Sequence, residues 1–401
     1  MRGFRVAYAR APRSEDVLVL GSAEILENTR KLAPQVAARA AEIARLRRLP
    51  ADLVADLKGA GVFRMPMPAA WGGPEMSPRA QNEVIEILSA ADASVGWCAM
   101  IGSDAGFYSA FLEEEAARAL YPDLDGVTAG MIQPAGRAVR VPGGYRVSGR
   151  WAFGSGCTHA DVIVGGCLLF DGDQPVLTEA GLPAFRVMLA PASAWRVIDT
   201  WYTTGLAGSG SHDYTTQDLF VPAERSFSLL EPARRQEPLY RFNGMFFINM
   251  HGVALGIARR AIDEVRDLAE KKTLVPELVL MRNVPRVRSA LARAEGMLGA
   301  ARAYTYETMD RVWDALLCQG RLSHELRLHV SLSRMQAFQT ARDVAQLMMD
   351  TAGSSSIYAT SPLDRLLRDA ITVRTHIAVQ ERLMERVAAL VVGEEPDVPF
   401  L

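Results

Sequence analysis

Residues 143–166 read GGYRVSGRWAFGSGCTHADVIVGG, and this stretch decides the class of fold. Apolar and polar residues alternate along its first half, which is typical of a strand with one buried face. An apolar run of strand length begins at Val162. Gly143 and Gly144 form a dipeptide that is typical of a hairpin turn. The stretch therefore predicts at least two short strands joined by tight turns.

The same pattern extends over residues 126–232 and stops on both sides. FRVMLAP (185–191) and DYTTQDLFVPAE (213–224) add two segments of strand length, and glycines are frequent between them. Four or more short strands separated by turns predict a small antiparallel barrel or sandwich.

Helical patterns flank this β region. Apolar residues recur every three or four positions from about Ser22 to Tyr121, and again in long segments after residue 240. The long segments are 249–270, 284–318, 323–349 and 362–392, and their inward alanines and leucines are typical of an antiparallel bundle. We therefore predict an α+β, mostly α, fold. Its parts are an N-terminal extension (1–21), a helical domain (22–125), a central β domain (126–232) and a C-terminal four-helix bundle (233–401).

The composition excludes several classes of protein. The 401 residues are 49% hydrophobic and 22% charged, with a formal net charge of -2, so nucleic acid and anionic membranes are not expected partners. The apolar stretches are too short or too interrupted to cross a bilayer. The start of the chain lacks the apolar core of a secretory signal. A cytoplasmic protein is expected, with its scattered cysteines reduced: Cys98, Cys157, Cys167 and Cys318.

Single motifs do not explain the chemistry. In HELRLH (324–329) the two histidines are five residues apart and face different sides of a helix, so we expect no metal site. Gly205, Gly208 and Gly210 lead into a β segment, whereas a dinucleotide fingerprint opens a helix. No phosphate loop or nucleophile elbow is present.

Four stretches together resemble the acyl-CoA dehydrogenase superfamily. They are DASVGWCAM (92–100), residues 143–166, WYTTGLAGSGSHDYTTQDLFVP (201–222) and SPLDRLLRDAITVRTHIAVQERL (361–383). The resemblance is closest to the branch of two-component flavin monooxygenases, the group D aromatic hydroxylases. It implies the order helical, β, helical, which is the order that the residue patterns predict.

The residues after Arg368-Asp369 distinguish the branches. In the main type of dehydrogenase, a Tyr-Glu-Gly stretch lies there and its glutamate removes the α-proton of the acyl thioester. The matching residues here are Thr375-His376-Ile377, with no carboxylate. A histidine at this place resembles the monooxygenases, where it lies beside the reactive edge of the flavin. An imidazole can take a proton from a phenol or an NH group and return one, so His376 is predicted to be catalytic.

His376 also has an ordinary structural interpretation. In a continuous helix it would share one face with Val373, Gln380, Leu383 and Val387, and an inward histidine is usually a core residue. The family resemblance favours the catalytic role.

The resemblance also implies a flavin site. Ser155 lies between two glycines that let the backbone approach a planar ring, and it is predicted to hydrogen-bond the flavin or its peroxide. Trp151 matches the tryptophan that packs against flavin in the wider family. A turn residue and a sheet-core residue are the ordinary alternatives for these two. The other expected cofactor contacts are Gly156, Cys157, Gly353 and Ser354.

The substrate pocket is expected to include Trp97 and Phe246. Many of these monooxygenases carry a second histidine a few residues after the Gly-Trp pair. Here Ser103 and Asp104 lie in that region, so the resemblance assigns them to the pocket in its place.

The resemblance implies a two-component monooxygenase. A separate reductase would supply FMNH2 or FADH2, and molecular oxygen would form a flavin C4a-hydroperoxide that hydroxylates a small phenol- or indole-like substrate. The family usually forms homotetramers. Three alternatives stay open: an acyl-CoA dehydrogenase with its base at Glu295 or Glu307, a member that oxidises nitrogen or sulfur, and a degenerate ligand-binding scaffold.

Overall fold

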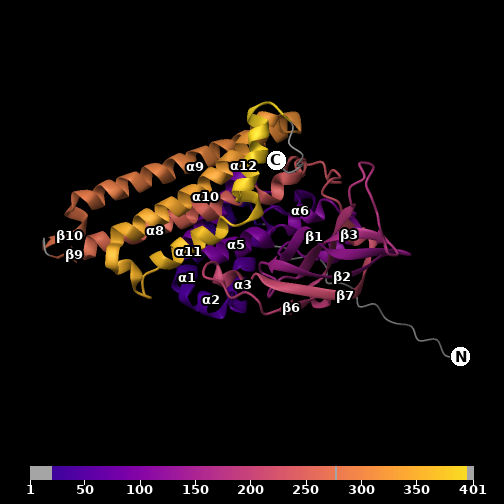
Figure 1. Cartoon of the computed structure of the whole chain (residues 1–401), viewed down its shortest axis with the longest axis horizontal. Helices are drawn as coiled ribbons and strands as arrows, with labels where there is room; N and C mark the ends of the chain where they lie inside the picture. Colours follow the sequence, from indigo (N-terminus) through magenta and orange to yellow (C-terminus); the bar gives the residue numbers. More distant parts are fainter. Residues whose placement is uncertain (1–19, 276–277, 395–401) are drawn as a thin grey trace.

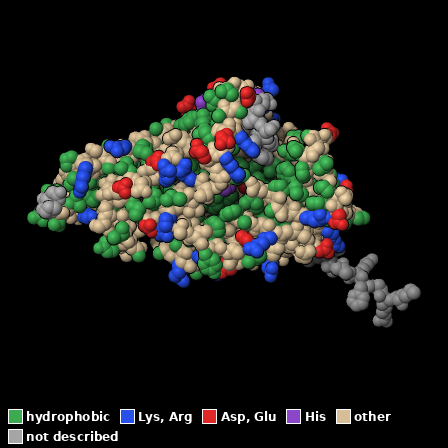
Figure 2. All heavy atoms as spheres, viewed as in Figure 1, with side chains coloured by type: hydrophobic (Ala, Val, Ile, Leu, Met, Phe, Trp, Pro, Cys, Tyr) green, Lys and Arg blue, Asp and Glu red, His purple; other side chains and the backbone are tan. Residues whose placement is uncertain are grey.

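A computed structural model describes residues 20–275 and 278–394 and places a sheet beside a long helical body (Figure 1). The predicted N-terminal extension therefore lies, except for residues 20 and 21, outside the described residues. Within the described residues no helix is long and apolar enough to cross a membrane. On the face shown in Figure 2, acidic and basic side chains are interspersed, in keeping with the small net charge.

The described N-terminal part contains seven α-helices and two short 3₁₀ helices, η1 (Val62–Arg64) and η2 (Ala69–Trp71). The α-helices are α1 (Ser22–Ala38), α2 (Ala40–Leu46), α3 (Ala51–Gly59), α4 (Pro78–Ala91), α5 (Ala93–Gly102), α6 (Ala105–Ser109) and α7 (Glu114–Leu120). Asp92 starts α5, because its Oδ1 accepts the backbone N–H groups of Ser94 and Val95. Almost every residue of α5 is buried, and the helix contacts α4, α8 and β1. It therefore lies at the junction of the helical body and the sheet.

The central part is one eight-stranded sheet. Its strands are β1 (Thr128–Val141), β2 (Gly144–Gly154), β3 (Val162–Asp171), β4 (Gln174–Pro175), β5 (Phe185–Pro191), β6 (Arg196–Ile198), β7 (His212–Pro222) and β8 (Ser226–Phe227). The order is β6-β7-β2-β1-β3-β5-β8, with β4 paired to β3. The predicted turn at Gly143 joins β1 to β2, with Val141 opposite Gly144, and Gly143 adopts a φ of 80°.

The expectation of antiparallel pairing is wrong at one place. β1 and β3 are parallel, while the other described pairings of this sheet are antiparallel. The connection after β2 carries the chain across to the other edge of β1, so β3 runs in the direction of β1. Alternation along a strand is the same in either direction, which is why the sequence pattern does not reveal this reversal.

The C-terminal part contains the long helices α8 (His251–Lys271), α9 (Pro285–Gln319) and α10 (His324–Ala352), close to their predicted bounds. A short hairpin of β9 (Thr273–Leu274) and β10 (Val279–Leu280) joins α8 to the α9 segment. The predicted last helix, 362–392, is wrong as a continuous element. It is divided into α11 (Leu363–Val373), the 3₁₀ turn η10 (Ile377–Val379) and α12 (Glu381–Val391).

The division of this last helix has a local cause. β-Branched residues are dense between Ile371 and Val379, and such residues lose side-chain freedom in a helix. His376 and Gln380 adopt extended backbone, with ψ angles of 140° and 151°. The segment 374–380, called here the α11–α12 break, therefore leaves the bundle axis and faces the sheet side of the molecule (Figure 1).

Candidate active site

His376 lies at the α11–α12 break, on extended backbone, so the expectation that it occupies a continuous helix face is corrected. Its Nδ1 accepts the backbone N–H of Ala378 at 3.2 Å. Burial, and secondly the charge of Arg334, lower the pKa of His376 to about 4. The ring is thus neutral at neutral pH, and because Nδ1 is an acceptor, the proton is on Nε2.

Aromatic rings enclose this imidazole. Trp97 on α5 packs edge-to-face with it at a centroid distance of 5.4 Å, and Phe247 does so at 5.7 Å. Phe247 ends the 3₁₀ helix η7 (Asn243–Phe247), and its ring contacts that of Phe246 at 4.5 Å. Trp97 and Phe246, both predicted for the substrate pocket, are therefore brought close to His376. Such a wall of rings limits the access of water.

Ser155 is connected to this cluster through Trp97. The indole Nε1–H of Trp97 donates to Ser155 Oγ at 2.9 Å, and Ser155 is buried. Ser155 Oγ also lies 2.7 Å from Ser211 Oγ, which in turn lies 2.7 Å from Ser209 Oγ. Ser209 Oγ donates to the carbonyl oxygen of Leu206 at 2.8 Å. The structure thus brings the two predicted catalytic residues, His376 and Ser155, into contact with one tryptophan.

The three serines form a continuous hydroxyl chain. If Ser209 donates to Leu206, then Ser211 donates to Ser209 and Ser155 donates to Ser211. If the chain reverses, Ser155 is free to donate outward. Chains of hydroxyls polarise one another, so the orientation of Ser155 depends on both of the other serines.

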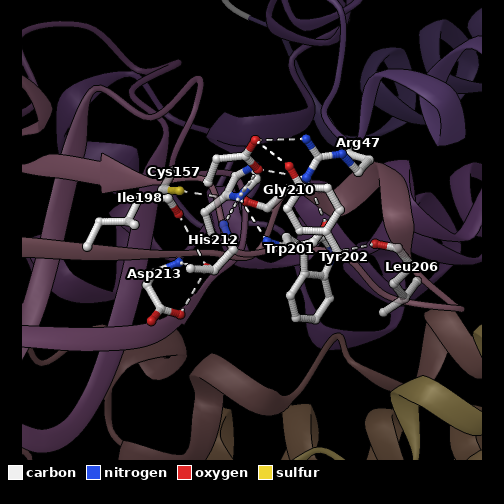
Figure 3. Close-up of polar contacts among 11 residues, drawn as sticks. Arg47, Cys157, Ile198, Trp201, Tyr202, Leu206, Gly210, His212 and Asp213 are labelled. Carbon is white, nitrogen blue, oxygen red and sulfur yellow. Dashed lines mark hydrogen bonds and ion pairs between the residues drawn. The ribbon is translucent and has the colours of Figure 1, made fainter.

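An ion-paired cluster fixes the loop before these serines (Figure 3). Arg47, which follows α2, binds Asp199 with two hydrogen bonds of 2.7 and 3.0 Å. Its guanidinium carbon lies 3.9 Å from the centre of the Tyr202 ring, and Tyr202 Oη donates to Asp199. These contacts tie the loop 199–206 to the N-terminal helices.

His212 holds the same loop from the sheet side. Its Nδ1 accepts the backbone N–H groups of Thr200 and Trp201, each at 3.2 Å. Asp199 lies 3.4 Å from this nitrogen. Burial lowers the pKa of His212, and a nitrogen that accepts two N–H groups carries no proton, so the contact with Asp199 is not an ion pair at neutral pH.

The loop also contacts α11. The backbone N–H of Leu206 donates to Asp369 Oδ1 at 2.6 Å, and Asp369 is buried. Burial, and secondly the nearby Asp92, raise the pKa of Asp369 to about 7. A Cβ atom on Gly205 would lie 2.3 Å from the carbonyl oxygen of Arg368, so only glycine permits this approach. The contacts of Asp369 and of the Arg368 backbone with this loop are therefore structural, and they set the distance between the serine chain and the α11–α12 break.

An exposed aromatic surface lies next to Ser155. Phe153 has a φ of 62°, which is rare for a residue with a side chain, and its ring is 60% exposed. The ring packs edge-to-face against Trp201 at 6.2 Å. The end of β2 thus presents a flat apolar ring two residues before the buried hydroxyl.

Trp151 lies in the core of the sheet, one of the two positions considered for it. Its ring is fully buried in the sheet, stacked on Tyr214 at 5.6 Å and against Trp195 at 5.2 Å, and its Nε1–H donates to the carbonyl oxygen of Gly166. Glycines make the space for it, since a Cβ atom on Gly136 would lie 2.1 Å from the ring. Trp151 therefore belongs to the core of the sheet, and its contact with a flavin stays a prediction.

Gly156 and Cys157 lie behind Ser155 and are buried. Gly156 has a φ of 75°, and its N–H donates to the carbonyl oxygen of Ser209. The thiol of Cys157 faces the carbonyl oxygen of Gly210 at 3.6 Å, and burial raises its pKa to about 12. Both residues shape the turn that carries Ser155.

Gly353 and Ser354 lie apart from His376 within this chain. They follow α10 in the 3₁₀ helix η9 (Gly353–Ile357), are exposed, and precede α11, whose full length separates them from the α11–α12 break. Within a single chain, Gly353 and Ser354 are therefore separated from the site.

Ser103 and Asp104 are interior residues at the end of α5. Ser103 Oγ donates to the carbonyl oxygen of Met100 and is fully buried. Tyr108 Oη donates to Asp104 Oδ2 at 3.4 Å, while Asp104 Oδ1 is buried without a partner in the described chain. Burial raises the pKa of Asp104 well above its ordinary value. Asp104 lies beside the apolar cluster that contains Phe246, Phe107 and Tyr108.

Several residues of the site were not predicted from the sequence. Ser211 lies in the quoted stretch 201–222, two residues after Ser209, and that spacing was its only signal. Phe153, Phe247 and Arg334 carry no motif, because their roles arise from segments that are distant in the sequence.

Comparisons with known proteins agree with this arrangement. Residues 22–124 match the model of the acyl-CoA dehydrogenase N-terminal domain, and residues 249–381 match that of the C-terminal domain. An indole-3-acetate monooxygenase of Pseudomonas putida is 33% identical, over 90% of this chain and 91% of that protein. The oxygenase component of an FADH(2)-dependent resorcinol hydroxylase of Rhizobium sp. is 30% identical, over 83% of this chain and 85% of that protein.

This chain belongs to the acyl-CoA dehydrogenase family. Within the family it is a flavin-dependent monooxygenase, and the predicted branch is confirmed. XiaF from Streptomyces sp., solved with FADH2 and glycerol, superposes with a TM-score of 0.86 at 26% identity, covering 95% of this monooxygenase and 98% of XiaF.

The residues of this monooxygenase fit a flavin. A flavin offers a flat, largely apolar ring with polar atoms at one edge. The exposed ring of Phe153 supplies an apolar surface, the Ser155 hydroxyl a reversible donor, and the neutral His376 a second donor in an aromatic enclosure. Ser155 and His376 are the residues that would face such a ring.

Proposed function

We propose that this monooxygenase hydroxylates a small aromatic or heteroaromatic substrate, phenol- or indole-like, with FMNH2 or FADH2 that a separate reductase supplies. The observation that carries the proposal is the neutral imidazole of His376, enclosed by Trp97 and Phe247 and joined through Trp97 to the buried hydroxyl of Ser155. The names of the relatives, an indole-3-acetate monooxygenase and a resorcinol hydroxylase, support an aromatic substrate.

The bound reduced flavin would supply the two electrons that activate molecular oxygen, so that one oxygen atom enters the substrate and the other leaves as water. His376 presents an N–H donor at Nε2, which can hold an oxygen atom of the substrate. To accept a proton at Nε2, the ring would first have to place a proton on Nδ1 and lose the Ala378 contact. His376 is therefore poised as a donor in its resting state and as a base only after that exchange. Ser155 donates outward when the hydroxyl chain is reversed.

The acyl-CoA dehydrogenase alternative receives no support from the placement of its two candidate bases. Glu295 is ion-paired with Arg259 across α8 and α9, with two contacts of 2.9 Å. Glu307 is exposed on α9. Neither carboxylate contacts His376, Trp97 or Ser155.

An anaerobic titration tests the proposal. The protein is titrated with FMNH2 and with FADH2, and 18O-labelled oxygen is then admitted with indole or resorcinol present. We expect saturable binding of a reduced flavin and one labelled oxygen atom in the product. With indole, the position of the label also separates carbon hydroxylation from oxidation at nitrogen. Steady turnover of an acyl-CoA with an artificial electron acceptor and no reductase would contradict the proposal. Unperturbed oxidation of free flavin would favour the ligand-binding scaffold.

We also propose a homotetramer in the cytoplasm. Ile357 and Tyr358 are 73% and 66% exposed, beside Gly353 and Ser354. Exposed apolar side chains of this size favour contact with another subunit. Such a contact would bring Gly353 and Ser354 to the cofactor of a neighbour. Light scattering after size-exclusion chromatography checks the mass, and a monomer would contradict this assembly.

A further inference from the structure

Arg334 on α10 is a buried cation without an acidic partner in the described chain. It is 2% exposed, and its only hydrogen bond there runs from Nε to the carbonyl oxygen of Ala378, at 3.1 Å. Its guanidinium carbon lies 5.8 Å from the centre of the Phe247 ring. Arg64, the other buried arginine of the described chain, is ion-paired with Asp125. Arg334 therefore differs from the usual pattern of a buried arginine.

The position of Arg334 connects it to the candidate active site. Arg334 and His376 share Phe247 as a neighbour, and Ala378, which Arg334 binds, is also the donor to His376 Nδ1. The positive charge contributes to the lowered pKa of His376. The Nη atoms of Arg334 have no hydrogen-bond partner in the described chain. They are not fully enclosed, so these donors lie at the small surface that the residue keeps accessible.

Burial of an unpaired guanidinium is unfavourable, because the charge loses its hydration. Burial lowers even the pKa of this arginine, to about 10. A contact with the Phe247 ring offsets only part of that loss. A carboxylate would compensate more fully, since its two oxygens match the planar donors of a guanidinium.

We infer that Arg334 binds a carboxylate of the substrate, so that the substrate class is an aromatic carboxylic acid and not a neutral phenol or indole. This inference rests on the proposed function, because it assumes that an aromatic substrate lies beside His376. Arg334 would hold the acid group, and the aromatic ring would then lie among Trp97, Phe246 and Phe247.

Calorimetric titrations test the inference. Indole-3-acetate and its neutral amide, indole-3-acetamide, are titrated into the protein under anaerobic conditions, with and without reduced flavin. The wild type should bind the acid about ten-fold more tightly than the amide or better, which is the scale of one charge-assisted contact. Arg334→Met should bind the two ligands alike, and Arg334→Lys should keep part of the preference.

Controls separate this effect from a fault in folding. Arg342→Met removes an arginine from the same helix that is ion-paired with Asp343 and partly exposed, and it should keep the wild-type preference. The melting temperature of Arg334→Met should equal or exceed that of the wild type, because the variant lacks the unpaired charge. Equal affinity of the wild type for acid and amide would overturn the inference. So would a loss of flavin affinity in Arg334→Met with an unchanged preference for the acid.

The two proposals fail in different ways. Incorporation of 18O into indole by the wild type, together with no preference for the acid, would keep the proposed function and overturn the role of Arg334. No incorporation into indole or indole-3-acetate with either reduced flavin would overturn the proposed function itself.

Discussion

At the scale of single residues, His376 combines a lowered pKa with an occupied Nδ1. A histidine with its ordinary pKa would be partly charged near neutral pH, whereas His376 is neutral down to about pH 4. Burial removes the water that would hydrate a charged imidazole, and the positive charge of Arg334 opposes a second one, so the neutral state is the stable one.

Replacement of His376 by alanine should separate binding from chemistry. We expect the affinity for reduced flavin to persist, while product formation falls by roughly 10²- to 10⁴-fold, the usual contribution of one positioned proton-transfer group. Flavin titration and product analysis by mass spectrometry measure the two effects. His329→Ala is the matched control, because His329 is bonded to Tyr304 on the bundle and should leave both quantities unchanged. Unchanged hydroxylation in His376→Ala would remove His376 from the mechanism.

The pH dependence of the rate follows from the same pKa. His376 becomes charged only when the pH falls through about 4, so its donor state is constant from about pH 5.5 to 8. The single-turnover rate of the wild type should therefore show no step near pH 6.5 that is absent from His376→Ala. Such a step would mean that the ring titrates with an ordinary pKa.

At the scale of elements, the loop 199–206 controls the distance between the sheet and α11. It is held by Arg47, by His212 and by Asp369, and Gly205 lies against the backbone of Arg368. The serine chain follows directly, so a shift of this loop moves the acceptor of Ser209 and with it the orientation of Ser155.

Gly205→Ala should weaken both stability and flavin binding. The added methyl would lie 2.3 Å from the carbonyl oxygen of Arg368, so the loop must move, and we expect a loss of about 1–3 kcal/mol in unfolding free energy. Gly299→Ala is the matched control, since Gly299 is exposed on α9 with open space around its Cβ position. Helix propensity alone should make that control neutral or about 1 kcal/mol more stable. Thermal melts and flavin titrations compare the two, and equal behaviour would show that the contact with α11 is unimportant.

The elements also show how far the sequence predicts this fold. The long helices α8, α9 and α10 follow from apolar spacing, because each has a buried stripe that runs its full length. The α11–α12 break does not follow, since the apolar pattern continues through it while β-branched residues and the His376 contact end the helix. His376, Ser155 and Trp97 were found through the family resemblance. The resemblance did not indicate Arg334, because the role of Arg334 is inferred from the lack of an acidic partner in the described chain, which the sequence does not show.

At the scale of the whole molecule, three histidines have strongly lowered pKa values because they are buried. The values are about 3 for His251, about 4 for His159 and about 4 for His376. In the unfolded chain each would take up a proton below about pH 6.5. The folded state binds fewer protons between pH 6.5 and 4, so these groups lower stability as the pH falls through that window. Asp369 acts with the opposite sign, because its pKa is raised to about 7.

The contribution of one histidine to the pH dependence of the unfolding free energy is therefore best measured as the difference between the wild type and a variant. His251 is fully buried, with Nε2 3.1 Å from Ser333 Oγ, so His251→Gln keeps a polar side chain but cannot titrate. The unfolding free energy of the wild type relative to this variant should decrease by about 1.4 kcal/mol per pH unit as the pH falls from 6 to 4. Urea unfolding at several pH values checks this slope. A constant difference would mean that His251 keeps its ordinary pKa.

The α11–α12 break has a consequence for how this scaffold changes its chemistry. Residues 374–380 are outside the helical ladder, so neither neighbouring helix depends on a helix-forming side chain at position 376. Exchange of the reactive group there, glutamate for histidine or either for another, alters the contact with the Ala378 N–H but leaves the hydrogen-bond ladders of α11 and α12 in place. Reactivity and foldability are thus encoded by separate stretches of the chain. A library randomised at positions 375–377 should consequently yield mostly folded proteins, and new activities can be selected from it without first restoring stability.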